Sequence, residues 1–124
     1  MAETVTVLPE TTDTAVCVRL SGMVTAEDFA RNLGDRVEQT VGTYGYYSSY
    51  ILYDETFKGW SREAADLSFR HISQFSRKAR RLAYVNAPDS RMLMMKMLQP
   101  ITNAEIRYFE LDEKEQAIAW ILER

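Results

Sequence analysis

The sequence predicts a single α/β domain, residues 1–124, with a five-stranded mixed sheet that is mostly parallel. Short apolar runs alternate along the chain with longer segments in which apolar residues recur at helical spacing. The resulting order, β-β-α-β-α-β-α-β-α, is typical of a sheet built from parallel crossover units. A chain of 124 residues can also bury a core that needs no disulfide or metal ion.

The first two strands are predicted from alternation of apolar and polar residues. Val5 and Val7 alternate, and so do the apolar residues of 16–20. The segment 9–14 between them carries Pro and Thr and suits a hairpin connection, which makes these strands an antiparallel edge of the sheet. Cys17 is expected to be a buried strand thiol, because free cysteines are commonly buried.

A helix over about residues 26–41 follows. Thr25 is a good N-cap, Asp28 stands where a carboxylate favours the helix dipole, and Gly42 is expected to end the helix. The uncharged run 50–53 then predicts a buried central strand, since such a strand is apolar on both faces.

The second half repeats this alternation to the C-terminus. Ser61 is expected to cap a helix that runs to about Ser76, and Pro88 and Pro100 bound a further helix. Asp112 and Glu115 are expected to cap the last helix. The remaining strands are predicted over 82–85 and about 106–111.

Composition excludes several classes of function. A net charge of −3 and a pI near 5.2 argue against nucleic-acid and anionic-membrane binding, which need a basic surface. One Cys and one His cannot assemble a metal site, and no cofactor motif is present. The sequence shows no signal peptide and no segment suited to membrane insertion, so a cytoplasmic location is expected.

Three segments carry a family resemblance. These are residues 21–28 (SGMVTAED), residues 53–61 (YDETFKGWS) and residues 104–109 (AEIRYF), the last continuing through Leu111 to Ala117 and Trp120. Together they resemble bacterial SpoIIAA-like proteins over about residues 15–124. The resemblance implies a fold shared with anti-sigma-factor antagonists (STAS domains) and with the lipid-binding lobe of CRAL-TRIO proteins. It implies no established activity, because fold likeness alone does not assign function.

The sequence departs from the STAS antagonists at the turn that carries their phosphorylated serine. Their Asp-Ser-Ser-Gly-type turn is replaced by residues 54–61, in which only Thr56 and Ser61 could accept phosphate. Neither stands in the required turn, and Glu55 and Glu63 would oppose a phosphate there. The usual phospho-switch is therefore not expected.

A candidate ligand site follows the central strand, because ligands of open α/β sheets favour the carboxyl ends of strands. The aromatic residues beside Gly59 either line a pocket there or attach the next helix to the sheet. His71 could support catalysis only with a partner such as Asp54 or Asp66. The favoured interpretation is a histidine packed in the structure, because His71 shares one face of its helix with Leu67 and Phe75. No catalytic residue is assigned. The candidate ligand-binding residues are Asp54, Phe57, Gly59, Trp60 and His71.

The methionine-rich run is the least ordinary feature. Six of the seven residues from Met92 to Leu98 are apolar, so this helix is apolar nearly all round and should be buried on more than one side. A second subunit could cover it, it could wall a cavity for a small apolar ligand, or it could be core. The candidate interface residues are Met92, Met94, Met95, Met97 and Leu98.

The favoured function is a non-enzymatic binding or regulatory module that acts through protein contacts, as a homo-oligomer, most simply a dimer, or with another protein. The alternative is a carrier of a small apolar, lipid-like molecule. A basic cluster precedes the fourth predicted strand and is interpreted either as a solvated connection or as a docking patch for an acidic partner. It consists of Arg77, Lys78, Arg80 and Arg81.

Overall fold

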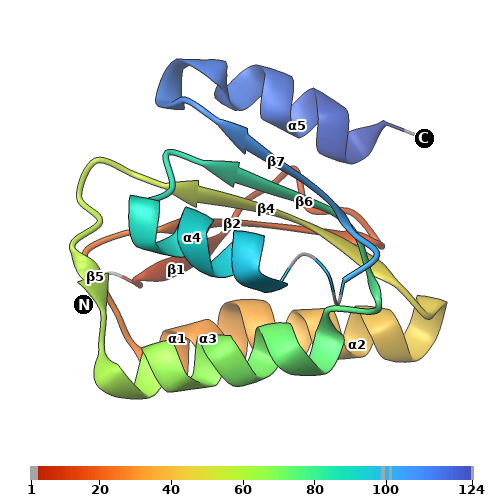
Figure 1. Ribbon diagram of the computed structural model, residues 1–124, viewed down its shortest axis with the longest axis horizontal. Coiled ribbons are helices and arrows are strands. Elements are labelled where there is room, and N and C mark those ends of the chain that lie inside the picture. The colour runs from red at the N-terminus through yellow and green to blue at the C-terminus, as the bar shows by residue number, and fades with distance from the viewer. Residues whose placement is uncertain (1–2, 99, 101, 124) are drawn as a thin grey trace.

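The five strands of the main sheet lie side by side in the order β1-β2-β4-β6-β7 (Figure 1). The computed structural model describes residues 3–98, 100 and 102–123, leaving out the side chains of residues 90, 94 and 98. Strand β1 runs antiparallel to β2, and the other three pairs are parallel, so the predicted mixed sheet is confirmed. The strands are β1 Val5–Val7, β2 Ala15–Leu20, β4 Tyr47–Tyr53, β6 Ala79–Val85 and β7 Glu105–Phe109.

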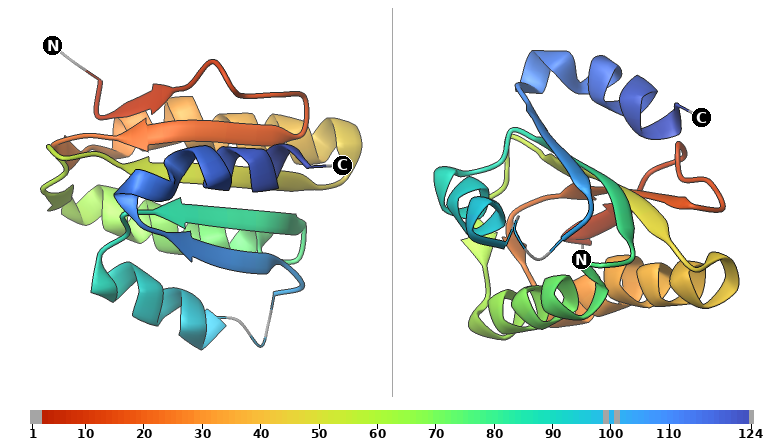
Figure 2. Two further views of the ribbon diagram at one scale, coloured as in Figure 1. Left: turned by 90° about the horizontal axis from the view of Figure 1, so that it is seen from above. Right: turned by 45° about the vertical axis from the view of Figure 1, so that its right-hand side comes forward.

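Helices cover the two faces of the sheet unequally (Figure 2). One face carries α1 Ala26–Phe29, the π-helical segment η1 Ala30–Gly34, α2 Asp35–Tyr44, α3 Arg62–Phe75 and α4 Asp89–Leu98. The opposite face carries α5 Lys114–Leu122, which follows the short 3-10 helix η3 Leu111–Glu113.

The period of two along the strands divides the core between these faces. In β2, Val16 and Val18 point into the larger cluster under α1, α3 and α4. Their neighbours Ala15 and Cys17 point into the cluster under α5, with Trp120. The central position of β4 and the burial of Cys17, both expected from the sequence, are confirmed.

Two predicted helix boundaries are wrong. Gly42 does not end the first helical segment, which continues to Tyr44 and ends at Gly45. Gly45 has φ of 84° and its N–H donates to the Val41 carbonyl, a left-handed C-cap that glycine favours. The cap before α5 is formed by Glu110 and Glu113 rather than by Asp112 and Glu115, because η3 starts the helical turn three residues earlier.

A second, two-stranded parallel sheet was not expected from the sequence. It pairs β3 Met23–Val24 with β5 Gly59–Trp60. Each strand has two residues, too few to show any periodicity. This small sheet holds Trp60 beside the first turn of α3, at the end of the molecule where β4 leads into α3.

Candidate functional site

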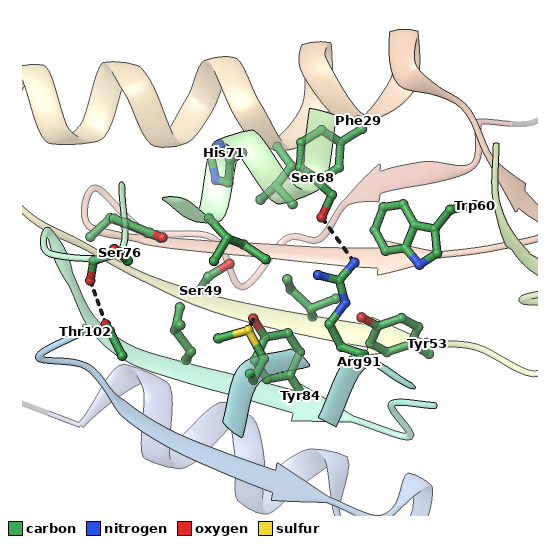
Figure 3. A pocket seen from close by; sticks show the side chains of 16 residues that line it. Phe29, Ser49, Tyr53, Trp60, Ser68, His71, Ser76, Tyr84, Arg91 and Thr102 are labelled. Atoms are coloured by element: carbon green, nitrogen blue, oxygen red, sulfur yellow. Dashed lines mark hydrogen bonds between the residues drawn. The ribbon is translucent and has the colours of Figure 1, made fainter. Parts of the chain in front are cut away.

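A cavity lies between the main sheet and the helices α1, α3 and α4 (Figure 3). Strands β4 and β6 form its floor, and side chains of α1, η1, β5, α3 and α4 form its walls. The cavity has a volume of about 30 Å³, which is room for about two water molecules.

Side-chain caps fix the N-termini of α1 and α3, two of the helices that wall the cavity. The Thr25 hydroxyl accepts a hydrogen bond from the Asp28 N–H at 3.2 Å, and the Ser61 hydroxyl accepts one from the Ala64 N–H at 3.1 Å. Both N-caps were predicted from the sequence and are confirmed.

The π-helical segment η1 lies directly over the cavity. It continues α1 without a break and buries Leu33 in the cavity wall, and its Gly34 lies close to the His71 imidazole on α3. Asn32 in the same segment is buried and donates a hydrogen bond to the Val5 carbonyl at 2.6 Å, which ties η1 to the edge strand. Such single π turns occur often at functional sites.

Aromatic rings from three elements meet at one wall. The Phe29 ring lies 5.9 Å from the Trp60 ring and 5.5 Å from the His71 ring, both in edge-to-face geometry. His71 also lies 5.0 Å from the Phe75 ring. Edge-to-face contacts of this kind are favourable beyond the burial of area, so they help to hold the three rings in place.

Several hydroxyl groups of the lining are already occupied by protein partners. The Ser49 hydroxyl donates to the Val16 carbonyl at 3.2 Å, and the Thr102 hydroxyl donates to the Ser76 carbonyl at 2.6 Å. The Tyr84 hydroxyl donates to the Met95 sulfur at 3.5 Å, and burial raises the pKa of this phenol. The surface left for a ligand is therefore largely apolar.

Arg91 is the exception to this apolar character. Its side chain extends from the first turn of α4 toward the cavity and is 8% exposed. Its guanidinium donates to the Ser68 hydroxyl at 3.1 Å, and its Cζ atom lies 4.7 Å from the centre of the Trp60 ring. Figure 3 shows the guanidinium between Ser68 and Trp60, with the Tyr53 ring beside it.

His71 is half-buried among these aromatic rings, and burial lowers its pKa to about 4. In the described part of the chain no carboxylate lies within ion-pair distance of its imidazole. Asp66 is exposed on the same helix, and Asp54 is bound elsewhere. The arrangement therefore provides no acid–base pair around His71.

The candidate ligand residues divide into two groups. Trp60 and His71 line the cavity. Phe57 lies behind Trp60, with ring centres 6.2 Å apart, and packs against Tyr53 at 4.9 Å. Gly59 supports β5 with φ of 141°, and neither it nor Asp54 belongs to the lining.

Asp54 instead organises the loop after β4. Its carboxylate accepts hydrogen bonds from the hydroxyls of Ser21 and Thr56, and Arg19 lies 3.6 Å away. Partial burial raises the pKa of Asp54, but the hydrogen bonds from Ser21 and Thr56 lower it overall. The Thr56 and Ser61 hydroxyls are thus both engaged in local structure, the first with Asp54 and the second in the α3 cap.

The described side chains of the methionine-rich helix α4 differ widely in burial. Met95 is in the core and lines the cavity, so it does not belong to an outer surface, while Met92 is partly buried. Leu93 and Met97 are 63% and 73% exposed. The side chains of Met94 and Leu98 lie outside the described residues.

The basic cluster forms part of a shallow groove at the opposite end of the sheet from β5. Arg80 stacks on Tyr46 with 3.6 Å between its Cζ atom and the ring centre, and Arg81 lies 3.5 Å from the Glu123 carboxylate. Arg77 and Lys78 are exposed. The groove also carries acidic residues, so its charge is mixed.

Metal-binding groups and membrane-spanning helices are both absent from the part of the chain that the structure describes. No three His, Cys, Asp or Glu residues converge there as metal ligands. None of the described helices combines the length and the apolar character that crossing a membrane requires.

Sequence reasoning missed the residue that gives the cavity its charge. Arg91 directly precedes the methionine run and was not predicted as a site residue. The signal was present, because Arg91 and Met95 are four residues apart and must share a helix face. Phe29, Ser68 and Tyr84 were also not predicted as site residues, since their meeting depends on the tertiary fold.

Comparisons with known proteins agree with this fold. The chain is similar to the crystal structure of an uncharacterized protein from the DUF3478 family with a SpoIIAA-like fold, from Shewanella loihica PV-4. The TM-score is 0.62 and the sequence identity is 17%, over 94% of this chain and 91% of that chain, a likeness that concerns the fold alone. No curated protein matches. A family model described as SpoIIAA-like matches residues 15–122, as the sequence resemblance predicted, and the chain therefore belongs to the SpoIIAA-like family.

Proposed function

We propose that this protein is a non-enzymatic binding module that takes up a small, largely apolar molecule in the cavity between the sheet and α1, α3 and α4. The observation that carries the proposal is the cavity wall, where Phe29, Trp60 and His71 converge from three elements. Ligand sites are typically concave, mostly apolar and equipped with few polar groups. The absence of a carboxylate near His71, among the described residues, supports a binding role rather than catalysis.

The size of the cavity requires that a ligand displace part of the wall. About 30 Å³ of free space is less than a benzene ring needs. Met95 is suited to this movement, because a methionine side chain has three rotatable bonds and adapts to irregular shapes. Helix α4, which carries Met95, also exposes Leu93 and Met97.

Titration with benzyl alcohol, followed by NMR of the ¹⁵N-labelled protein, tests the proposal. We expect saturable shifts of the Trp60 indole N–H and of backbone amides in α3 and α4. Ile72→Phe adds a ring inside the lining and should abolish these shifts. Gln74→Phe adds the same ring to the exposed side of α3 and should leave them unchanged.

Two results would contradict the proposal. One is the absence of saturable shifts with benzyl alcohol and with the more extended 1-octanol. The other is binding that Ile72→Phe does not weaken, which would place the ligand outside the cavity. Native mass spectrometry of the protein isolated from its own host adds an independent search for a co-purifying molecule.

A second function, contact with another copy of the chain or with a partner protein, is favoured by the exposed apolar residues of α4. Leu93 and Met97 are four residues apart and share a helix face. If this face is an interface, light scattering after size exclusion should show a dimer that Leu93→Ser with Met97→Ser converts to a monomer. A monomer at every concentration of the unchanged protein would remove the dimer.

A further inference from the structure

Arg91 is a buried cation without a counter-ion in the described part of the chain. Arg91 is only 8% exposed, yet among the described residues no Asp or Glu lies within 4 Å of its guanidinium. The groups near it are neutral, namely the Ser68 hydroxyl, the Trp60 ring and the phenols of Tyr53 and Tyr84.

This arrangement is costly for a residue that serves structure alone. Buried arginines are normally paired with carboxylates, because removing a charge from water costs several kcal/mol. A guanidinium has five N–H donors, of which Ser68 accepts one and the Tyr53 phenol takes up another. An anion in the cavity would use the remaining donors and supply the missing charge.

We infer that the ligand of this cavity carries one carboxylate, which Arg91 binds while the aromatic wall holds the apolar body. This inference rests on the proposed function and names the class of molecule that the cavity takes. Figure 3 shows the guanidinium and the rings of Trp60 and Phe29 on the same side of the cavity, so both parts of one small molecule can be reached.

Charge balance favours a carboxylate over a phosphate ester. A carboxylate carries one negative charge, which one guanidinium neutralises, and its two oxygens match the guanidinium fork. A phosphate monoester carries about −1.5 to −2 at neutral pH. Among the described lining residues Arg91 is the one permanent cation, and the His71 imidazole is kept neutral by burial.

Matched ligands that differ in the acidic group test the inference. Benzoate, benzyl alcohol and phenyl phosphate are titrated into the unchanged protein, Arg91→Met and Arg91→Lys, with Arg36→Met as the control on an exposed arginine. We expect the unchanged protein and Arg36→Met to bind benzoate about tenfold or more tightly than benzyl alcohol. Arg91→Met should bind the two equally, and Arg91→Lys should retain part of the preference.

The melting temperature separates ligand binding from a structural role. Replacing an unpaired buried charge by methionine, which fills a similar volume, should leave the melting temperature unchanged or raise it. A marked fall in the melting temperature, with the benzoate preference retained, would show that Arg91 serves packing and would overturn the inference.

The ligand series also distinguishes failure of the inference from failure of the proposed function. Benzyl alcohol binding that Ile72→Phe abolishes, without any preference for benzoate, would refute the carboxylate and leave the cavity as an apolar site. A preference for phenyl phosphate over benzoate would refute the choice of carboxylate. If none of the three ligands binds and 1-octanol gives no saturable shifts either, both proposals fail.

Discussion

His71 gives the molecule a pH dependence that can be predicted at the level of one residue. Its pKa is about 4 in the folded protein and about 6.5 in an unfolded chain. Between these values the unfolded chain binds a proton that the folded protein does not, so stability present above pH 6.5 is lost as the pH falls toward 4. From pH 7 to pH 5 the loss in free energy of unfolding amounts to about 2 kcal/mol.

Urea unfolding at pH 7 and pH 5 measures this loss. His71→Phe keeps an aromatic ring beside Phe29 and Phe75 and removes the titrating group, so its stability should change far less between these pH values. Asp28 and Asp54 contribute little over this interval because hydrogen bonds hold the pKa of each carboxyl below its ordinary value. An equal loss in both proteins would assign the pH dependence to other groups.

At the level of one element, the two glycines near the end of α2 should respond to alanine in opposite directions. Gly42 lies inside the helix with open space around its Cα, so Gly42→Ala should stabilise the protein by about 0.5–1 kcal/mol. Gly45 has φ of 84°, a backbone conformation that alanine adopts with strain. Gly45→Ala should therefore destabilise it by about 1 kcal/mol.

Thermal unfolding of Gly42→Ala and Gly45→Ala measures both changes in stability. A stabilised Gly45→Ala would mean that the helix continues past Tyr44 in solution, and a destabilised Gly42→Ala would mean that it ends earlier, as its spacing first suggested. The Gly-based prediction failed because the sequence offers two glycines three residues apart, and only the backbone angle distinguishes them.

At the level of the whole molecule, the fold was largely predictable because each main element carries its own periodicity. Val16, Val18 and Leu20 alternate as a strand must, and the helix N-caps Thr25 and Ser61 follow local rules. The β3–β5 sheet and the π segment η1 were not predictable, since two-residue strands and a single widened turn leave no pattern in the sequence.

The cavity was predictable only in part. Trp60 and His71 were found because each is chemically distinctive at its place in the chain. Arg91 is a candidate ligand-binding residue because it is buried beside Ser68 and Trp60. Neither contact can be predicted from sequence spacing, because the three residues belong to different elements. Its lack of a counter-ion is likewise a property of the tertiary structure.

The two faces of the sheet differ in how they are closed, and Cys17 can report the difference. Its thiol is fully buried in the cluster that α5 covers, and burial raises its pKa to about 12, so reaction with a thiol reagent such as DTNB requires this face to open. Trp120 is the largest side chain that α5 places there.

Trp120→Ala should destabilise the protein by about 3–5 kcal/mol and should accelerate labelling of Cys17 by DTNB under native conditions. Leu33→Ala, which removes buried volume on the opposite face at a cost of about 2–5 kcal/mol, is the matched control. Because α5 covers the face of Cys17, while α1, η1, α2, α3 and α4 cover the other, we expect α5 to open locally. The rate of Cys17 labelling should then increase more in Trp120→Ala than the loss of global stability of this variant explains. If the labelling rates of Trp120→Ala and Leu33→Ala both change as their global stabilities do, the two faces open together.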